Sequence, residues 1–123
     1  MAQSDIATDE TQQLIASNKV EGTAVYNRDG ERLGSIYNFM VDKLSGEVEY
    51  AVLSFGGLFG MGSDYYPLPW DVLTYDTDRG GYVVDLDKSV LEKAPHYSSG
   101  NEPPYDRAYG REVYGHYGLE YPY

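Results

Sequence analysis

Three turn motifs divide this chain into short segments, and their spacing limits the fold more than any other feature of the sequence. The turns occupy residues 27–30, 42–46 and 77–81, and each contains aspartate together with glycine. These residue types tolerate the backbone angles of tight turns, and the Asp-Gly pair of the first turn is typical of a β-hairpin. The spacing therefore predicts short strands joined by close turns.

Five segments beside these turns are predicted as strands. In residues 33–41, apolar or aromatic side chains fall on both faces, which predicts a strand covered on both sides. Five short strands favour an all-β fold, namely a small closed or partly open β-barrel, because closure removes the exposed edges of the sheet. The predicted strands are residues 20–26, 33–41, 47–55, 65–76 and 82–87.

Short helical turns are predicted on either side of this barrel. The first covers residues 9–17, where Asp9 and Gln12 have the spacing of a capping box. The second lies in "KSVLEKAP", where Ser89 and Glu92 have the same spacing and a proline follows.

These elements divide the chain into an N-terminal extension (residues 1–18), a barrel domain (19–95) and a tail (96–123). The tail has seven tyrosines, four glycines and three prolines, but no isoleucine, phenylalanine or tryptophan. A segment with so few aliphatic side chains gains little from ordering, so we expect it to be flexible. The alternative is a docking segment whose tyrosines pack on a neighbouring surface.

Charge and composition exclude several function classes. The chain has 20 acidic and 9 basic residues and a formal net charge of −11, which argues against a nucleic-acid partner. Without cysteine it has no disulfide and no thiol nucleophile. No segment has the length of a membrane span and no targeting signal is recognisable, so a soluble, cytoplasmic protein is expected.

Residues 54–70 read "SFGGLFGMGSDYYPLPW" and raise the question of a phosphate-binding loop. Two of the glycines have P-loop spacing, but Ser63 and Asp64 follow where the motif needs lysine. A dinucleotide-binding motif fails as well, because Tyr65 stands in place of its third glycine. The segment instead indicates a flap with apolar tips over the barrel mouth or against a second subunit.

Other groups that carry chemistry form no coherent catalytic set. Asp76, Asp78 and Asp87 have the spacing of ligands in a calcium-binding loop, but a β-turn explains the same residues, so calcium binding is the weaker reading. His96 and His116 lack a recognisable partner for metal binding or catalysis. We therefore expect a protein that is not an enzyme and has no cofactor.

Residues 19–95 resemble the PRC-barrel family, named for the cytoplasmic domain of the photosynthetic reaction centre H subunit. The resemblance rests on the order of "DGERLGSI", "VDKLSGEVEYAV" and "PLPW". It implies a compact β-barrel that serves protein interaction and assembly, as in the H subunit and in a ribosome-maturation factor with a similar barrel. It also implies a bacterial protein without a shared catalytic motif.

The function expected from the sequence is therefore a non-enzymatic module for protein interaction or assembly. A homodimer is expected, and the module would be an accessory to a larger electron-transport or ribonucleoprotein complex. The alternative is a small-ligand or calcium-binding protein that uses the barrel mouth or residues 76–87. The predicted contact residues are Leu58, Phe59, Met61, Tyr65, Tyr66 and Trp70.

Overall fold

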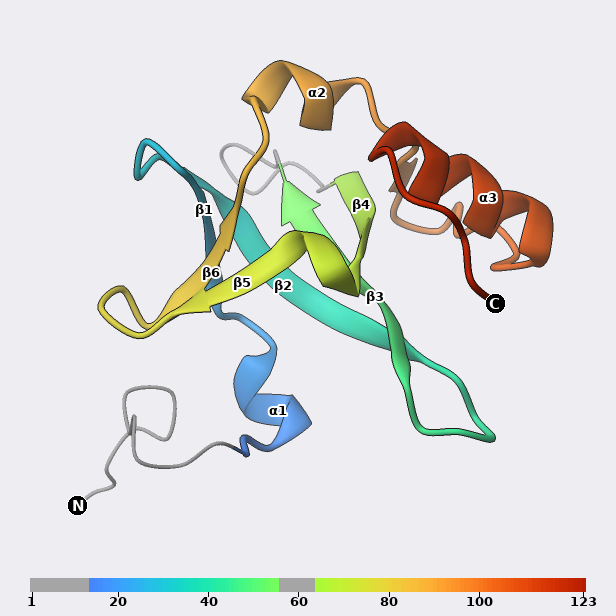
Figure 1. Ribbon diagram of the computed structural model, residues 1–123, viewed down its shortest axis with the longest axis horizontal. Coiled ribbons are helices and arrows are strands. Elements are labelled where there is room, and N and C mark those ends of the chain that lie inside the picture. Colours follow the sequence, from blue (N-terminus) through green and yellow to red (C-terminus); the bar gives the residue numbers. More distant parts are fainter. Residues whose placement is uncertain (1–13, 56–63) are drawn as a thin grey trace.

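The computed structural model describes residues 14–55 and 64–123 of the chain (Figure 1). Within these residues, seven strands form one sheet in the order β5-β6-β1-β2-β3-β4-β7. The strands are β1 (Ala24–Asn27), β2 (Arg32–Val41), β3 (Val48–Phe55), β4 (Asp64–Pro69), β5 (Leu73–Asp76), β6 (Gly81–Val84) and β7 (Tyr97–Ser98). The helices are α1 (Ser17–Val20), the 3₁₀ turn η3 (Trp70–Val72), α2 (Lys88–Glu92) and α3 (Arg107–His116).

The sheet curls into a barrel-like shape, but hydrogen bonds among the described strands do not close it. Strand β5, which pairs with β6, is the first strand in this order, and β4, which pairs with β3, is followed only by the two-residue β7. The three residues of η3 connect β4 directly to β5, so the chain itself brings the two ends of the sheet together (Figure 1). The expected all-β fold is thus confirmed, whereas a closed barrel is not confirmed.

The predicted turns connect the strands as their residues require. Gly30 and Gly46 adopt φ values of +86° and +79°, which glycine reaches without steric cost. Asn27 also secures the first turn, because its side-chain oxygen accepts the Glu31 N–H at 2.9 Å. Strands β1 and β2, and strands β2 and β3, are antiparallel neighbours, as the turns predict.

The interior of the sheet is filled by aliphatic and aromatic side chains from every part of the barrel, which we call the barrel core. Strand β3 contributes Ala51 and Leu53, and β4 contributes Tyr66 and Leu68. Strand β1 adds Val25, which is fully buried. The alternate residues of these strands point outward.

The outward face of β3 is also buried, under the tail. Tyr50 there is 2 % exposed and packs with Val113 and Tyr114 of α3, which are 0 % and 4 % exposed. We call this group the outer cluster. Partly buried residues complete it, namely Met40, Tyr105, Tyr109, Tyr117, Leu119 and Tyr121.

The tail therefore differs from the flexible segment expected from its composition. Helix α3 begins after Asp106, whose carboxylate accepts the Tyr109 N–H at 2.9 Å, and the helix lies against β4 (Figure 1). Tyrosine rings supply the buried surface that the missing aliphatic side chains would have supplied. The tyrosines of the tail pack on a neighbouring surface, as in the docking alternative, but that surface is the chain's own sheet.

Two smaller expectations about helices also need correction. Helix α2 begins at Lys88 with Asp87 at its N-cap, so Ser89 is inside the helix and no capping box with Glu92 forms. The capping box expected at Asp9 lies outside the described residues. Residue 20 ends helix α1 and does not start the first strand.

A pair of glycine substitutions in α3 tests how the tail is held. A Cβ at Gly110 would overlap with the ring of Tyr121, whereas a Cβ at Gly115 would meet nothing within 4 Å. We expect Gly110→Ala to lower the free energy of unfolding by about 1–3 kcal/mol through overpacking. Gly115→Ala should raise it by roughly 0.5–1 kcal/mol, because alanine favours a helix.

Urea unfolding followed by circular dichroism measures both variants. The two substitutions share the same helix and the same added methyl group, so their difference reports the Tyr121 contact. Equal effects of the two variants would contradict the packing of the tail described above.

Candidate functional site

The β2–β3 hairpin presents apolar side chains to solvent at its tip. Leu44 is 99 % exposed and Val41 is 50 % exposed, and the hairpin extends beyond the rest of the sheet (Figure 1). The turn is nevertheless well ordered, because one carboxylate oxygen of Asp42 accepts the backbone N–H groups of Leu44 and Ser45, at 2.8 and 2.9 Å. These hydrogen bonds lower the pKa of the Asp42 carboxyl. Leu44 therefore stands on a rigid support.

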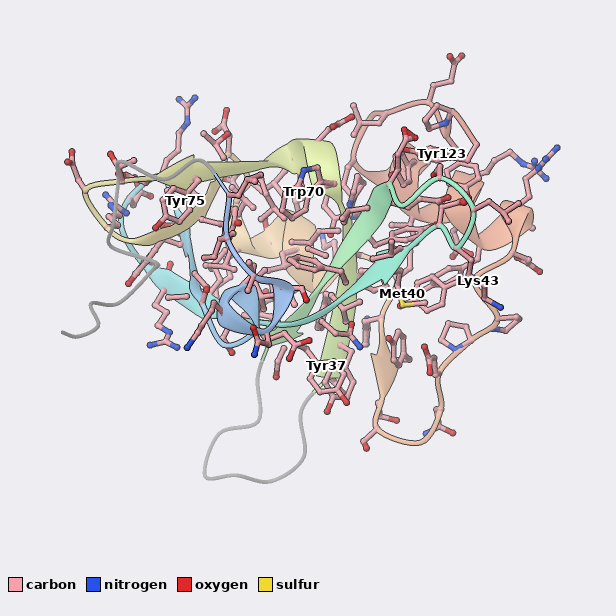
Figure 2. The ribbon with its side chains drawn as sticks, turned by 90° about the horizontal axis from the view of Figure 1, so that it is seen from below. Tyr37, Met40, Lys43, Trp70, Tyr75 and Tyr123 are labelled. Carbon is pink, nitrogen blue, oxygen red and sulfur yellow. The ribbon has the colours of Figure 1, made fainter. Side chains whose placement is uncertain are left out.

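Acidic groups surround this tip. Tyr123, which is 42 % exposed, lies on the same side of the molecule as the hairpin (Figure 2). Desolvation is the largest cause that raises the pKa of its phenol. The negative charges of Glu47, Glu49, Asp71 and Asp42 raise this pKa further. We call Val41, Leu44 and Tyr123, with these acidic neighbours, the hairpin-tip surface.

A second exposed group consists of tyrosines beside the middle of β2. Tyr37 is 50 % exposed, and its ring lies 4.5 Å from that of Tyr65, centroid to centroid. Tyr65 also contacts Tyr97 of β7 at 5.7 Å. Tyr37 occupies the position where the register of β2 against β3 shifts, between Ile36 and Asn38. Sequence reasoning missed Tyr37 because regular alternation hides a bulge.

The six predicted contact residues fall into three groups. Leu58, Phe59 and Met61 lie outside the described residues. Tyr65 is partly buried within the tyrosine group on the surface. Tyr66 and Trp70 belong to the interior of the barrel or pack against it.

Tyr66 is buried in the barrel core, and Trp70 is partly buried against it. Tyr66 is 5 % exposed, and its ring stacks on His96 at 4.6 Å. Trp70 packs edge-on against Phe39 at 5.3 Å and also contacts Tyr82. The reason is alternation, since the inward positions of β4 carry Tyr66 and Leu68 and η3 turns Trp70 toward the same core.

Asp76, one of the three aspartates of the calcium alternative, takes part in other interactions. Asp76 accepts the Asp78 N–H at 2.9 Å and forms an ion pair with Arg79 at 3.6 Å. Asp87 stands at the N-cap of α2. Among the residues that the structure describes, no group of three histidine, aspartate or glutamate side chains is arranged to hold a metal ion.

An open depression of about 420 Å³ lies beside the β5–β6 hairpin. Arg28, Thr74, Asp76 and Asp85 are among the residues that line it. Its charged groups are paired, because Arg28 contacts Asp85 at 3.0 Å. The depression therefore adds no specific support to the small-ligand alternative, which stays a prediction.

Both histidines have structural contacts. The Nε2 of His116 lies 2.9 Å from the Val90 carbonyl oxygen, which ties α3 to the segment of α2. The Nδ1 of His96 lies 2.9 Å from the Ala94 carbonyl oxygen. Neither contact brings a histidine to a carboxylate or a hydroxyl nucleophile.

The phenols of the outer cluster have raised pKa values because they are removed from water. Burial is the largest cause for Tyr109, whose pKa rises to about 12, with smaller effects from Tyr97 and Glu112. Burial also raises the pKa of Tyr105 and of Tyr114. The folded state therefore favours the neutral phenols.

These pKa shifts predict instability in alkali. Phenols in an unfolded chain ionise near pH 10, so the stabilisation should be complete below about pH 10 and decline as the pH rises toward about 12. Urea unfolding at several pH values, with tyrosinate absorbance recorded in parallel, would measure this decline. Tyr109→Phe, which removes one such phenol, should make the decline less steep.

A different result would be decisive. If all phenols ionised together near pH 10 while the free energy of unfolding stayed constant, the outer cluster would not be packed as described.

Comparison with known proteins identifies a protein family that this chain matches. A family model described as "PRC-barrel domain" matches residues 13–91. The match includes β1 to β6 and most of α2, and it ends before α3. No curated protein matches the chain. Among the described helices, none is long and apolar enough to pass through a membrane.

Proposed function

Since this chain belongs to the PRC-barrel domain family, we propose that it is a non-enzymatic module for protein interaction and assembly. It serves as an accessory to a larger complex, of the electron-transport or ribonucleoprotein kind. The single observation that carries the proposal is the hairpin-tip surface, where a rigid turn holds Leu44 99 % exposed. The exposed side chains of Leu44, Val41 and Tyr123 gather at the hairpin tip, and a group of exposed apolar side chains is typical of a site that contacts another molecule.

The charges around the tip define the partner. Asp42, Glu47, Glu49 and Asp71 act electrostatically on Tyr123, and the whole chain carries a net charge of −11. Such a surface attracts a protein segment in which an apolar side chain is flanked by lysine or arginine, because complementary charge steers the encounter. Acidic segments and nucleic acid are repelled by the same charges.

Binding of a model peptide tests this surface. The probe is a short peptide of alternating leucine and lysine, with a leucine–glutamate peptide of equal length as its counterpart. We expect only the basic peptide to bind and to shift the amide NMR signals of residues 41–47. Leu44→Ser should weaken the binding roughly tenfold, because an unburied leucine forfeits about 1.5 kcal/mol.

Leu14→Ser is the matched control, since Leu14 is also exposed, at 85 %, but lies before α1 and outside the hairpin-tip surface. Its affinity for the basic peptide should equal that of the unaltered chain. Equal affinities of Leu44→Ser and the unaltered chain would refute the assignment of the surface.

Tyr37 of β2 and Tyr65 of β4 support the second part of the proposal, which is self-association as a homodimer. Tyr37 and Tyr65 present two rings in tilted contact at the surface. Two chains of net charge −11 repel each other, so their contact requires an apolar or aromatic patch of this kind. The remaining residues proposed for the contact are Leu58, Phe59 and Met61.

Light scattering after size exclusion tests the dimer. The unaltered chain should have the mass of two copies, and Tyr37→Asp should have the mass of one while keeping its circular dichroism spectrum. Leu14→Asp places the same charge elsewhere on the surface and should remain dimeric. A monomeric unaltered chain would show that the self-association proposal is wrong.

A further inference from the structure

Eight tyrosine rings form a continuous series of contacts through the molecule, which we call the tyrosine array. Neighbouring rings in the series have centroid distances between 4.5 and 6.4 Å. The series connects strands β2, β3 and β4 with the tail. In order, its members are Tyr37, Tyr65, Tyr97, Tyr105, Tyr50, Tyr114, Tyr121 and Tyr123.

Both ends of the array reach solvent and its middle is buried. Tyr37 is 50 % and Tyr123 42 % exposed, whereas Tyr50 is 2 % and Tyr114 4 % exposed. The two exposed ends lie on different sides of the molecule (Figure 2). The array therefore connects two separate surfaces through a dry interior.

One-electron oxidants oxidise tryptophan and tyrosine side chains most readily. The single tryptophan, Trp70, lies among the rings of the barrel core. Electrons tunnel rapidly between aromatic rings that are almost in contact. We propose that the tyrosine array is a relay that carries an oxidising equivalent from one surface of the protein to the other.

The oxidant that fits is a one-electron oxidant such as an organic peroxyl radical. It takes one electron and the phenolic proton from exposed Tyr37, becomes a hydroperoxide and leaves a tyrosyl radical. In each following step the radical gains an electron and a proton and is a phenol again, while its neighbour loses an electron and its phenolic proton. The radical thus moves along the array without net loss of atoms or charge.

Proton acceptors decide where the radical stops. The Tyr121 hydroxyl donates to the Glu49 carboxylate at 2.9 Å, and this charged acceptor makes the Tyr121 phenol easier to oxidise. The hydroxyls of Tyr97 and Tyr105 lie 2.8 Å apart and hydrogen-bond with each other, so the acceptor in that pair is a neutral phenol. The radical therefore collects at Tyr121 and exposed Tyr123, where a small reductant such as ascorbate returns one electron and one proton.

The test starts the radical at the Tyr65–Tyr97 end. The chain has no cysteine, so Ser99→Cys gives one thiol, on an exposed residue two positions after Tyr97, for a ruthenium polypyridyl photosensitiser. A flash with an external electron acceptor makes ruthenium(III), which takes one electron from the array. A nitroso spin trap then marks the tyrosine on which the radical rests, and peptide mass spectrometry identifies it.

We expect trap adducts on Tyr121 and Tyr123 in the labelled chain. Tyr105→Phe and Tyr50→Phe each interrupt the array, because phenylalanine keeps the ring but is far harder to oxidise, so these adducts should be lost. Tyr109→Phe is the matched control, since Tyr109 contacts Tyr105 at 5.2 Å as a side branch of the array. This control should keep the adducts.

Two results would overturn the relay. One is a labelled chain in which the adducts stay on Tyr65 and Tyr97. The other is equal adduct yield at Tyr121 and Tyr123 in the interrupted and the uninterrupted chains. Circular dichroism confirms that each variant is folded, and because two separate positions interrupt the array, one folded variant is enough for the decision.

Discussion

Burial of strand β3 on both faces is the constraint on which the rest of the structure depends. Its residues alternate between the barrel core, through Ala51 and Leu53, and the outer cluster, through Tyr50. A strand of this kind needs a second layer, since an exposed face of large apolar residues would invite association with other chains. The tail provides that layer. The Tyr114 hydroxyl donates to the Glu49 carbonyl oxygen and fixes the tail against β3.

The tail lies outside the domain that the family model matches, so the molecule consists of this domain and an additional C-terminal segment. The matched domain ends at residue 91, whereas Val113 and Tyr114, which cover Tyr50, lie beyond it. The barrel core lies within the matched part except for Ala94, which is buried, and Tyr117, which packs against the core. Properties that depend on the outer cluster, including its alkaline sensitivity and the tyrosine array, therefore belong to this chain's combination of domain and tail and are not implied by the family.

Local chemistry made the strands predictable, and long-range packing made the tail unpredictable. The turns at Gly30 and Gly46 follow from residues that act on their own backbone, so sequence reasoning found both hairpins. The outer cluster depends on partners up to 72 residues apart, such as Glu49 and Tyr121. Signals for α3 were present, however. Asp106 is a favourable N-cap, and Gly118, with φ of +75°, is a favourable stop after a segment with an apolar stripe.

The choice of tyrosine in the outer cluster is itself informative. The hydroxyls of Tyr109 and Tyr117 are buried without a hydrogen-bond partner among the described residues. Each unpaired hydroxyl costs about 1–3 kcal/mol, so phenylalanine would pack there more favourably. Packing therefore explains why rings occupy these positions but does not explain why the rings are phenols. Tyr105, Tyr114 and Tyr121 differ, because their hydroxyls form hydrogen bonds and belong to the proposed relay.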